Sequence, residues 1–172
     1  MKKLFGKLFV ISLVLTLSIG CLSIPSQAEA APQPVNNMVL ISEDIEYLSN
    51  GITLITSIYE DISINKSSAT KGTPYTKSGK RTQTAKNGTT TLYSFTITGT
   101  FTVNPGVSAT CTSSVPSHTI DHSDWSLSSS SASKSGNKAL GTGVFKRTLL
   151  FFTVETQTLN LTLTCSTNGV LS

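Results

Sequence analysis

Residues 92–103 have the sequence LYSFTITGTFTV, and this stretch decides the fold. Large apolar side chains occupy the odd positions from Tyr93 to Val103, interrupted only by Gly99, and every even position between them is Ser or Thr. Successive side chains of a β-strand point to opposite faces, so this alternation predicts a long strand with one buried face. We expect the odd positions to face the core.

The same alternation continues on both sides of this strand. The sequence Asn-Pro-Gly at 104–106 is typical of a turn, and alternation resumes over 107–111, which predicts a β-hairpin. It returns over 159–165 with apolar residues on odd positions, whereas 150–154 carries them on even positions. This change of phase predicts a β-bulge or a twist between two sheets.

Shorter patterns complete the predicted fold. We expect strands at 52–60 and 80–86, two more from residue 125 onward, a long polar loop at 66–79, and a short helix or extended strap at 38–48. Seven or eight strands without a long helical pattern predict an all-β fold, a single antiparallel β-sandwich.

The two cysteines of the predicted fold share the apolar face of their strands. The sequence has three cysteines, and two remain if Cys21 leaves with a signal peptide. An even number of cysteines in an exported chain predicts a disulfide, here between Cys111 and Cys165. Such a bridge closes a loop of about 55 residues and stabilises the fold by roughly 4 kcal/mol. With Trp125 between them, the cysteines resemble the Cys–Trp–Cys pattern of immunoglobulin-type sandwiches, although Leu163 stands where those domains have a Tyr. We expect an immunoglobulin-like architecture, with a different strand topology as an alternative, and a bridge packed near Trp125.

The N-terminal segment predicts export. Three lysines among the first seven residues precede an apolar run over 8–19, and Ala28 and Ala30 have the spacing of a signal-peptidase site. The run is short for a membrane span, so we expect a signal peptide at 1–30 and no transmembrane segment in the mature chain. Alternatively, Gly20 before Cys21 loosely resembles a lipobox, which predicts a lipid anchor on Cys21.

Charge divides the mature chain into two parts. Charged residues make up only 13% of the sequence, about half the usual share. The segment 31–50 has acidic residues but no basic ones and contains two prolines near its start, so we expect a flexible acidic lead-in. The β-sandwich domain is expected over 51–172.

Two groups of polar residues are candidate sites. The densest set of possible metal ligands or acid–base groups consists of His118, Asp121, His122 and Asp124. We interpret it as a solvated surface loop and expect no catalysis, metal or cofactor there.

Five basic residues without an intervening acid form a possible anion-binding patch. They are Lys71, Lys77, Lys80, Arg81 and Lys86. The partner of such a patch would be an anionic cell-wall polymer, with another surface protein as an alternative partner of the domain, and solvated lysines are the alternative interpretation. Nucleic acid is not expected, because the stretch lacks a series of aromatic residues for base stacking.

Three segments resemble a known group of proteins. The motif SASKSGNKA at 131–139, the hairpin at 101–111 and the ending over 161–172 are similar to small secreted proteins of Gram-positive bacteria, an uncharacterised family with a domain of unknown function. The resemblance implies export and paired cysteines and transfers no activity. We expect a secreted, non-enzymatic binding or structural module at or near a cell surface. The alternatives are a bacteriocin-like effector acting on competitor membranes and a hydrolase using the 118–124 loop.

Overall fold

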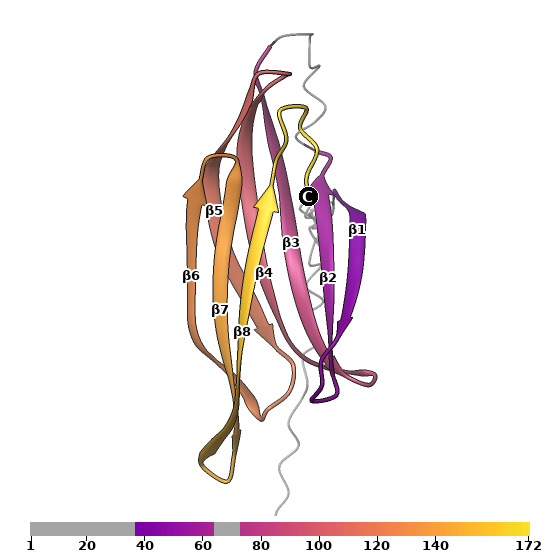
Figure 1. Ribbon diagram of the computed structural model, residues 1–172, viewed down its shortest axis with the longest axis vertical. Coiled ribbons are helices and arrows are strands. Elements are labelled where there is room, and N and C mark those ends of the chain that lie inside the picture. Colours follow the sequence, from indigo (N-terminus) through magenta and orange to yellow (C-terminus); the bar gives the residue numbers. More distant parts are fainter. Residues whose placement is uncertain (1–36, 64–72) are drawn as a thin grey trace, which may run out of the picture. The chain divides into compact units, whose positions relative to one another are not determined.

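The computed structural model describes residues 37–63 and 73–172. The expected signal peptide, Cys21 and Lys71 lie outside these residues. The described part contains eight strands (Figure 1). These are β1 (Met38–Tyr47), β2 (Ile52–Asp61), β3 (Tyr75–Asn87), β4 (Thr90–Asn104), β5 (Ser108–Ile120), β6 (Trp125–Ser135), β7 (Lys138–Leu149) and β8 (Phe152–Thr164).

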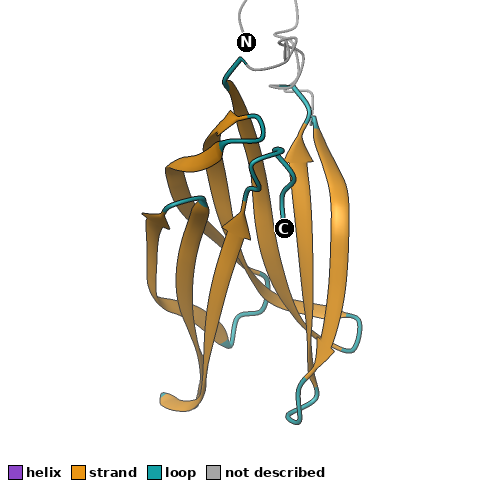
Figure 2. Ribbon diagram, turned by 45° about the horizontal axis from the view of Figure 1, so that its top comes forward, coloured by secondary structure: helices purple, strands orange, loops and turns teal. Residues whose placement is uncertain are grey.

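The strands form two antiparallel sheets that pack face to face. One sheet has the order β1-β2-β3-β4-β5 and the other has the order β6-β7-β8 (Figure 2). The all-β, two-sheet architecture predicted from the alternation is confirmed. Neighbours in each sheet are consecutive along the chain, and the chain changes sheets once, between β5 and β6. This meander differs from the Greek-key connections of immunoglobulin domains.

Strand β4 supplies much of the core, as its sequence predicts. Tyr93, Phe95, Ile97 and Phe101 are fully buried and face the smaller sheet. The Tyr93 ring stacks on that of Phe145 in β7, with ring centroids 4.1 Å apart. Burial of each such side chain stabilises the fold by roughly 1.5–3 kcal/mol, so this strand anchors both sheets.

The predicted change of phase before residue 159 corresponds to a bulge. The register of β7 and β8 shifts between Arg147 and Thr148, and Val154 has no partner in the ladder between them. The apolar residues beyond the bulge do not enter the core, because Phe152 is 75% exposed and Val154 is 53% exposed. They belong to a hairpin that leaves the sandwich.

Two segments differ from their predictions. Most of the expected flexible lead-in, Met38–Tyr47, is edge strand β1, paired along its length with β2. This agrees with the extended alternative for 38–48 and excludes the short helix. None of its residues is buried, so its formation leaves no apolar periodicity in the sequence. The expected loop at 66–79 ends at Tyr75, where β3 begins. This polar start of β3 pairs with the end of β4, whose apolar residues alternate with polar ones. The start of β3 has no such alternation of its own, so the sequence did not indicate a strand there. In the part of the chain that the structure describes, no helix is long and apolar enough to cross a membrane.

Candidate functional site

Four of the five basic residues predicted as one patch, all except Lys71, lie on two faces of β3. Lys80 and Lys86 share the outer face, where the Lys80 ammonium lies 4.8 Å from the centroid of the Tyr59 ring. Arg81 points the other way and donates a hydrogen bond of 2.9 Å to the Thr162 carbonyl of the opposite sheet. Lys77 is also turned inward and is only 7% exposed. The residues therefore do not form one exposed cationic surface.

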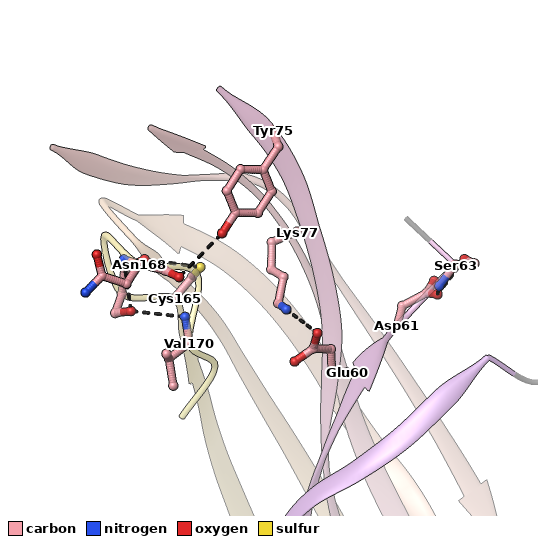
Figure 3. Close-up of polar contacts among 9 residues, drawn as sticks. Glu60, Asp61, Ser63, Tyr75, Lys77, Cys165, Asn168 and Val170 are labelled. Atoms are coloured by element: carbon pink, nitrogen blue, oxygen red, sulfur yellow. Dashed lines mark hydrogen bonds and ion pairs between the residues drawn. The ribbon is translucent and has the colours of Figure 1, made fainter. Parts of the chain in front are cut away.

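The inward Lys77 belongs to a partly buried polar cluster. Its ammonium forms an ion pair with Glu60 of β2 (Figure 3). Tyr75 and Cys165 lie beside this pair, and Cys165 is fully buried. Burial raises the pKa of the Cys165 thiol to about 11, although the Lys77 charge acts in the opposite direction. The ion pair joins β2 to β3, and the Tyr75 hydroxyl donates a hydrogen bond to the Asn168 carbonyl, which follows β8.

The predicted disulfide is not formed in this structure. Cys111 and Cys165 are buried free thiols. Their Sγ atoms contact the carbonyls of Ser113 and Ser166, respectively. Their position also differs from the prediction, because both backbones bond the turn that follows β6, whereas Trp125 begins that strand.

The candidate cluster at 118–124 is divided between a strand and a turn. His118 lies in β5 and pairs with Phe95 rather than belonging to a loop. Nδ1 of His122 accepts a hydrogen bond of 3.3 Å from the Asp124 backbone, and Asp124 lies 3.8 Å from the Arg147 guanidinium. Among the described residues, no three His, Cys, Asp or Glu side chains gather closely enough to hold a metal ion.

A pocket lies at the end of the sandwich where the strands β7 and β8 are joined. Its volume is about 280 Å³. Turns and strand ends from both sheets supply its lining, namely Asn50, Ile52, Asn87, Thr90, Leu92, His122, Trp125, Arg147 and Glu155. These walls come from segments far apart in the sequence, so the pocket exists only in the assembled fold.

The pocket combines a carboxylate and a guanidinium with buried apolar residues. Oε1 of Glu155 accepts hydrogen bonds from Asn50, at 2.5 Å, and from Gln157, at 3.0 Å. Trp125 is 4% exposed, and its ring centroid lies 4.6 Å from that of Tyr93. Burial, followed by the charge of Glu155, raises the pKa of Tyr93. The charged groups of the pocket thus lie beside tightly packed aromatic rings.

The β7–β8 hairpin extends past this pocket and ends in apolar residues. Leu150 is 86% exposed, Phe151 99% and Phe152 75%. Figure 1 shows this hairpin reaching beyond the other turns at the same end of the sandwich. Both turn residues have positive φ, 46° for Leu150 and 73° for Phe151. This turn usually takes Asn-Gly, since bulky side chains strain a left-handed backbone.

Neither the pocket nor the exposed tip was predicted as a site. The pocket residues are scattered from Asn50 to Glu155, and no motif joins them. One feature of the sequence could have indicated the tip. The four residues at 149–152 are all large and apolar, whereas a half-buried strand alternates apolar with polar residues. The alternation at 150–154 indicates a strand face and does not reveal that this face is exposed. Comparisons of the chain with protein-family models, curated proteins and solved structures find no match.

Proposed function

We propose that this chain is an exported, non-enzymatic binding protein that attaches to the lipid surface of a bacterial cell through the tip of its β7–β8 hairpin. The observation that carries the proposal is the exposure of three consecutive large apolar side chains, Leu150, Phe151 and Phe152, at the end of a projecting hairpin. A water-soluble domain gains nothing from such a tip, whereas contiguous exposed apolar surface marks interaction sites.

The shape of the tip favours a bilayer over a protein groove. The hairpin is convex, and its ladder closes with the pair Leu149 and Phe152, so apolar side chains surround a two-residue turn. A fluid apolar medium covers such a tip from all sides, whereas a groove covers one face. The tight turn also leaves few backbone groups without a partner, which the interior of a bilayer requires.

The distance of the first charged residues from the hairpin turn suits attachment to a bilayer. Lys146 and Arg147 precede the turn by three to four residues, which is roughly 10–13 Å along a strand. Interfacial segments bury their apolar part about 5–10 Å deep. The two cations therefore reach the level of the phosphates, where long basic side chains extend to the polar groups.

The strained backbone of the turn supports a functional role for its bulky apolar residues. A left-handed conformation costs roughly 1–2 kcal/mol for each non-glycine residue, and both Leu150 and Phe151 adopt it. Backbone strain of this kind collects at functional sites. If the three tip residues transfer at roughly 1.5 kcal/mol each, the dissociation constant is about 0.5 mM, which describes a reversible contact.

The test is co-sedimentation of the protein with phosphatidylcholine vesicles, with and without phosphatidylglycerol. We expect the wild type to sediment with both kinds of vesicle, and more strongly with the anionic lipid. The double variant Leu150→Asn/Phe151→Gly keeps the turn and should lose most of this binding. The matched control is Val107→Asn/Val170→Asn, which removes two exposed apolar side chains that are 71% and 63% exposed at the other end of the sandwich.

The proposal is wrong if wild type and tip variant sediment equally, or if the wild type does not sediment at all. An entrapped dye distinguishes surface attachment from the alternative of a membrane-active effector. We expect the dye to stay inside the vesicles. Its release by the wild type and not by the tip variant would favour the effector.

A further inference from the structure

We propose that the pocket at the base of the β7–β8 hairpin is a second binding site, and that its ligand is a neutral polyhydroxyl group, a single sugar unit. The inference does not depend on the apolar tip, because it is argued from the walls of the pocket, and Arg147 is the one residue that both proposals use. The pocket has a volume of about 280 Å³, which is slightly below the range for drug-sized ligands and suits one small ring.

The walls offer unused hydrogen-bond donors and acceptors side by side. Both protein donors to Glu155 use Oε1, so Oε2 remains as an acceptor. Nδ1 of His122 accepts a backbone proton, which places the proton of the neutral ring on Nε2 as a donor. Arg147 donates no hydrogen bond to any group in the described part of the chain. Its guanidinium lies 3.8 Å from Asp124, and its cross-strand partner is Glu155.

Two further pocket residues can both donate and accept hydrogen bonds. The amide of Asn87 and the hydroxyl of Thr90 line the pocket. Neither side chain forms a hydrogen bond within residues 37–63 and 73–172. An amide offers donors and an acceptor, and a hydroxyl offers one donor and two acceptor positions. A ligand that matches this set must itself donate and accept at several adjacent atoms, as neighbouring sugar hydroxyls do.

The charges of the pocket argue against a simple ion. An anion at Arg147 would face the carboxylates of Glu155 and Asp124, and a cation at Glu155 would face the guanidinium. A neutral ligand bonds all of these groups without repulsion, and charge-assisted bonds to hydroxyls are stronger than neutral ones. Ile52, Leu92 and Trp125 provide apolar surface in the same pocket for the C–H face of a sugar ring.

A wall glycan and the headgroup of a glycolipid offer the same chemistry. The pocket lies at the level of Arg147 and Glu155, which are cross-strand partners three to four residues from the hairpin turn. A glycolipid headgroup is therefore within reach if the tip enters a bilayer. A glycan strand reaches the pocket without lipid. Binding to glycolipid vesicles and to purified wall distinguishes the two sources. Free sugar should release the protein from the one that retains it.

Trp125 provides the measurement, because it is the single tryptophan of the chain and lines the pocket. The probes are glucose and N-acetylglucosamine, with inorganic phosphate and ethanolamine as the anionic and cationic comparisons. We expect a saturable change in tryptophan fluorescence with at least one sugar at millimolar concentration, and none with the two ions. Absence of saturation by both sugars, or saturation by an ion alone, would overturn the proposal.

Conservative variants locate the binding site. Glu155→Gln keeps the shape of the side chain and removes the charge, and Thr90→Val removes only the hydroxyl. We expect each to weaken sugar binding about tenfold, which corresponds to about 1.4 kcal/mol. Asp44→Asn, on exposed strand β1, is the matched control and should bind as the wild type does.

Equal affinity in wild type, Glu155→Gln and Thr90→Val would place any sugar binding elsewhere and refute this site. The tip variant Leu150→Asn/Phe151→Gly should still bind sugar, because it leaves every lining residue in place. Loss of vesicle binding with retained sugar binding separates the two proposals, as does the reverse result.

Discussion

The backbones of Cys111 and Cys165 form hydrogen bonds with consecutive residues of one turn. The backbone N–H of Cys111 donates to the Gly136 carbonyl at 2.8 Å, and that of Cys165 donates to the Asn137 carbonyl at 3.0 Å. Cys111 comes from the larger sheet and Cys165 follows the last strand of the smaller one. The β6–β7 turn thus brings together two cysteines that are far apart in the sequence, at the end of the sandwich opposite the pocket.

We expect these cysteines to form the predicted disulfide under oxidising conditions. Two thiols give up two protons and two electrons to oxidised glutathione, and the Sγ–Sγ bond forms. The expected gain is roughly 4 kcal/mol of unfolding free energy over the reduced protein. Intact mass should fall by two hydrogens, and peptide mapping without reductant should recover the bridge. Two thiols that still react with iodoacetamide after denaturation would contradict this expectation, and Cys111→Ser is the control.

The reduced protein should lose stability in alkali. Burial raises the pKa of Cys165 from the ordinary 9.0 to about 11, so the folded chain holds this proton more tightly than the unfolded chain does. The contribution of the thiol to stability is therefore complete below pH 9 and is lost as the pH rises toward 11. Urea unfolding in reductant between these pH values measures the slope. Cys165→Ala should flatten it, and an unchanged slope would assign the effect to other groups.

Replacing the tip should stabilise the fold even as it removes lipid binding. A turn with two positive φ values favours the dipeptide Asn-Gly, so Leu150→Asn/Phe151→Gly relieves strain of roughly 1–2 kcal/mol at each position. We expect a gain of roughly 2–4 kcal/mol in unfolding free energy, measured by urea titration. Val107→Asn/Val170→Asn should show no such gain. A destabilised tip variant would mean that Leu150 and Phe151 contribute to folding.

Adjacent basic residues on β3 should respond differently to charge reversal. Arg81→Glu removes a charged donor from the Thr162 carbonyl between the two sheets, and we expect a loss of roughly 1.5–3 kcal/mol. Lys80→Glu changes an outer-face residue over Tyr59 and should cost less than about 1 kcal/mol. Thermal unfolding of both variants provides the comparison. Equal losses would contradict the two-face arrangement.

The sequence by itself determined the strands whose burial is one-sided. In β4 the alternation from Tyr93 to Val103 predicted both the strand and its buried face, because a period of two is imposed by backbone geometry alone. The bulge at Val154 and the two-sheet architecture followed from the same patterns.

Only the tertiary structure decided the features that leave no periodic pattern in the sequence. Strand β1 is held by pairing with β2, and its exposed residues carry no apolar pattern. Lys77 is polar in the sequence and nearly buried in the fold, because Glu60 on the neighbouring strand compensates its charge. The pocket joins Asn50 to Glu155 through a hydrogen bond across 105 positions of the chain. The Asn50–Glu155 contact depends on how the two sheets close over each other, and the other two contacts depend on which strands pair within one sheet. A single sequence encodes both only through all of its residues together.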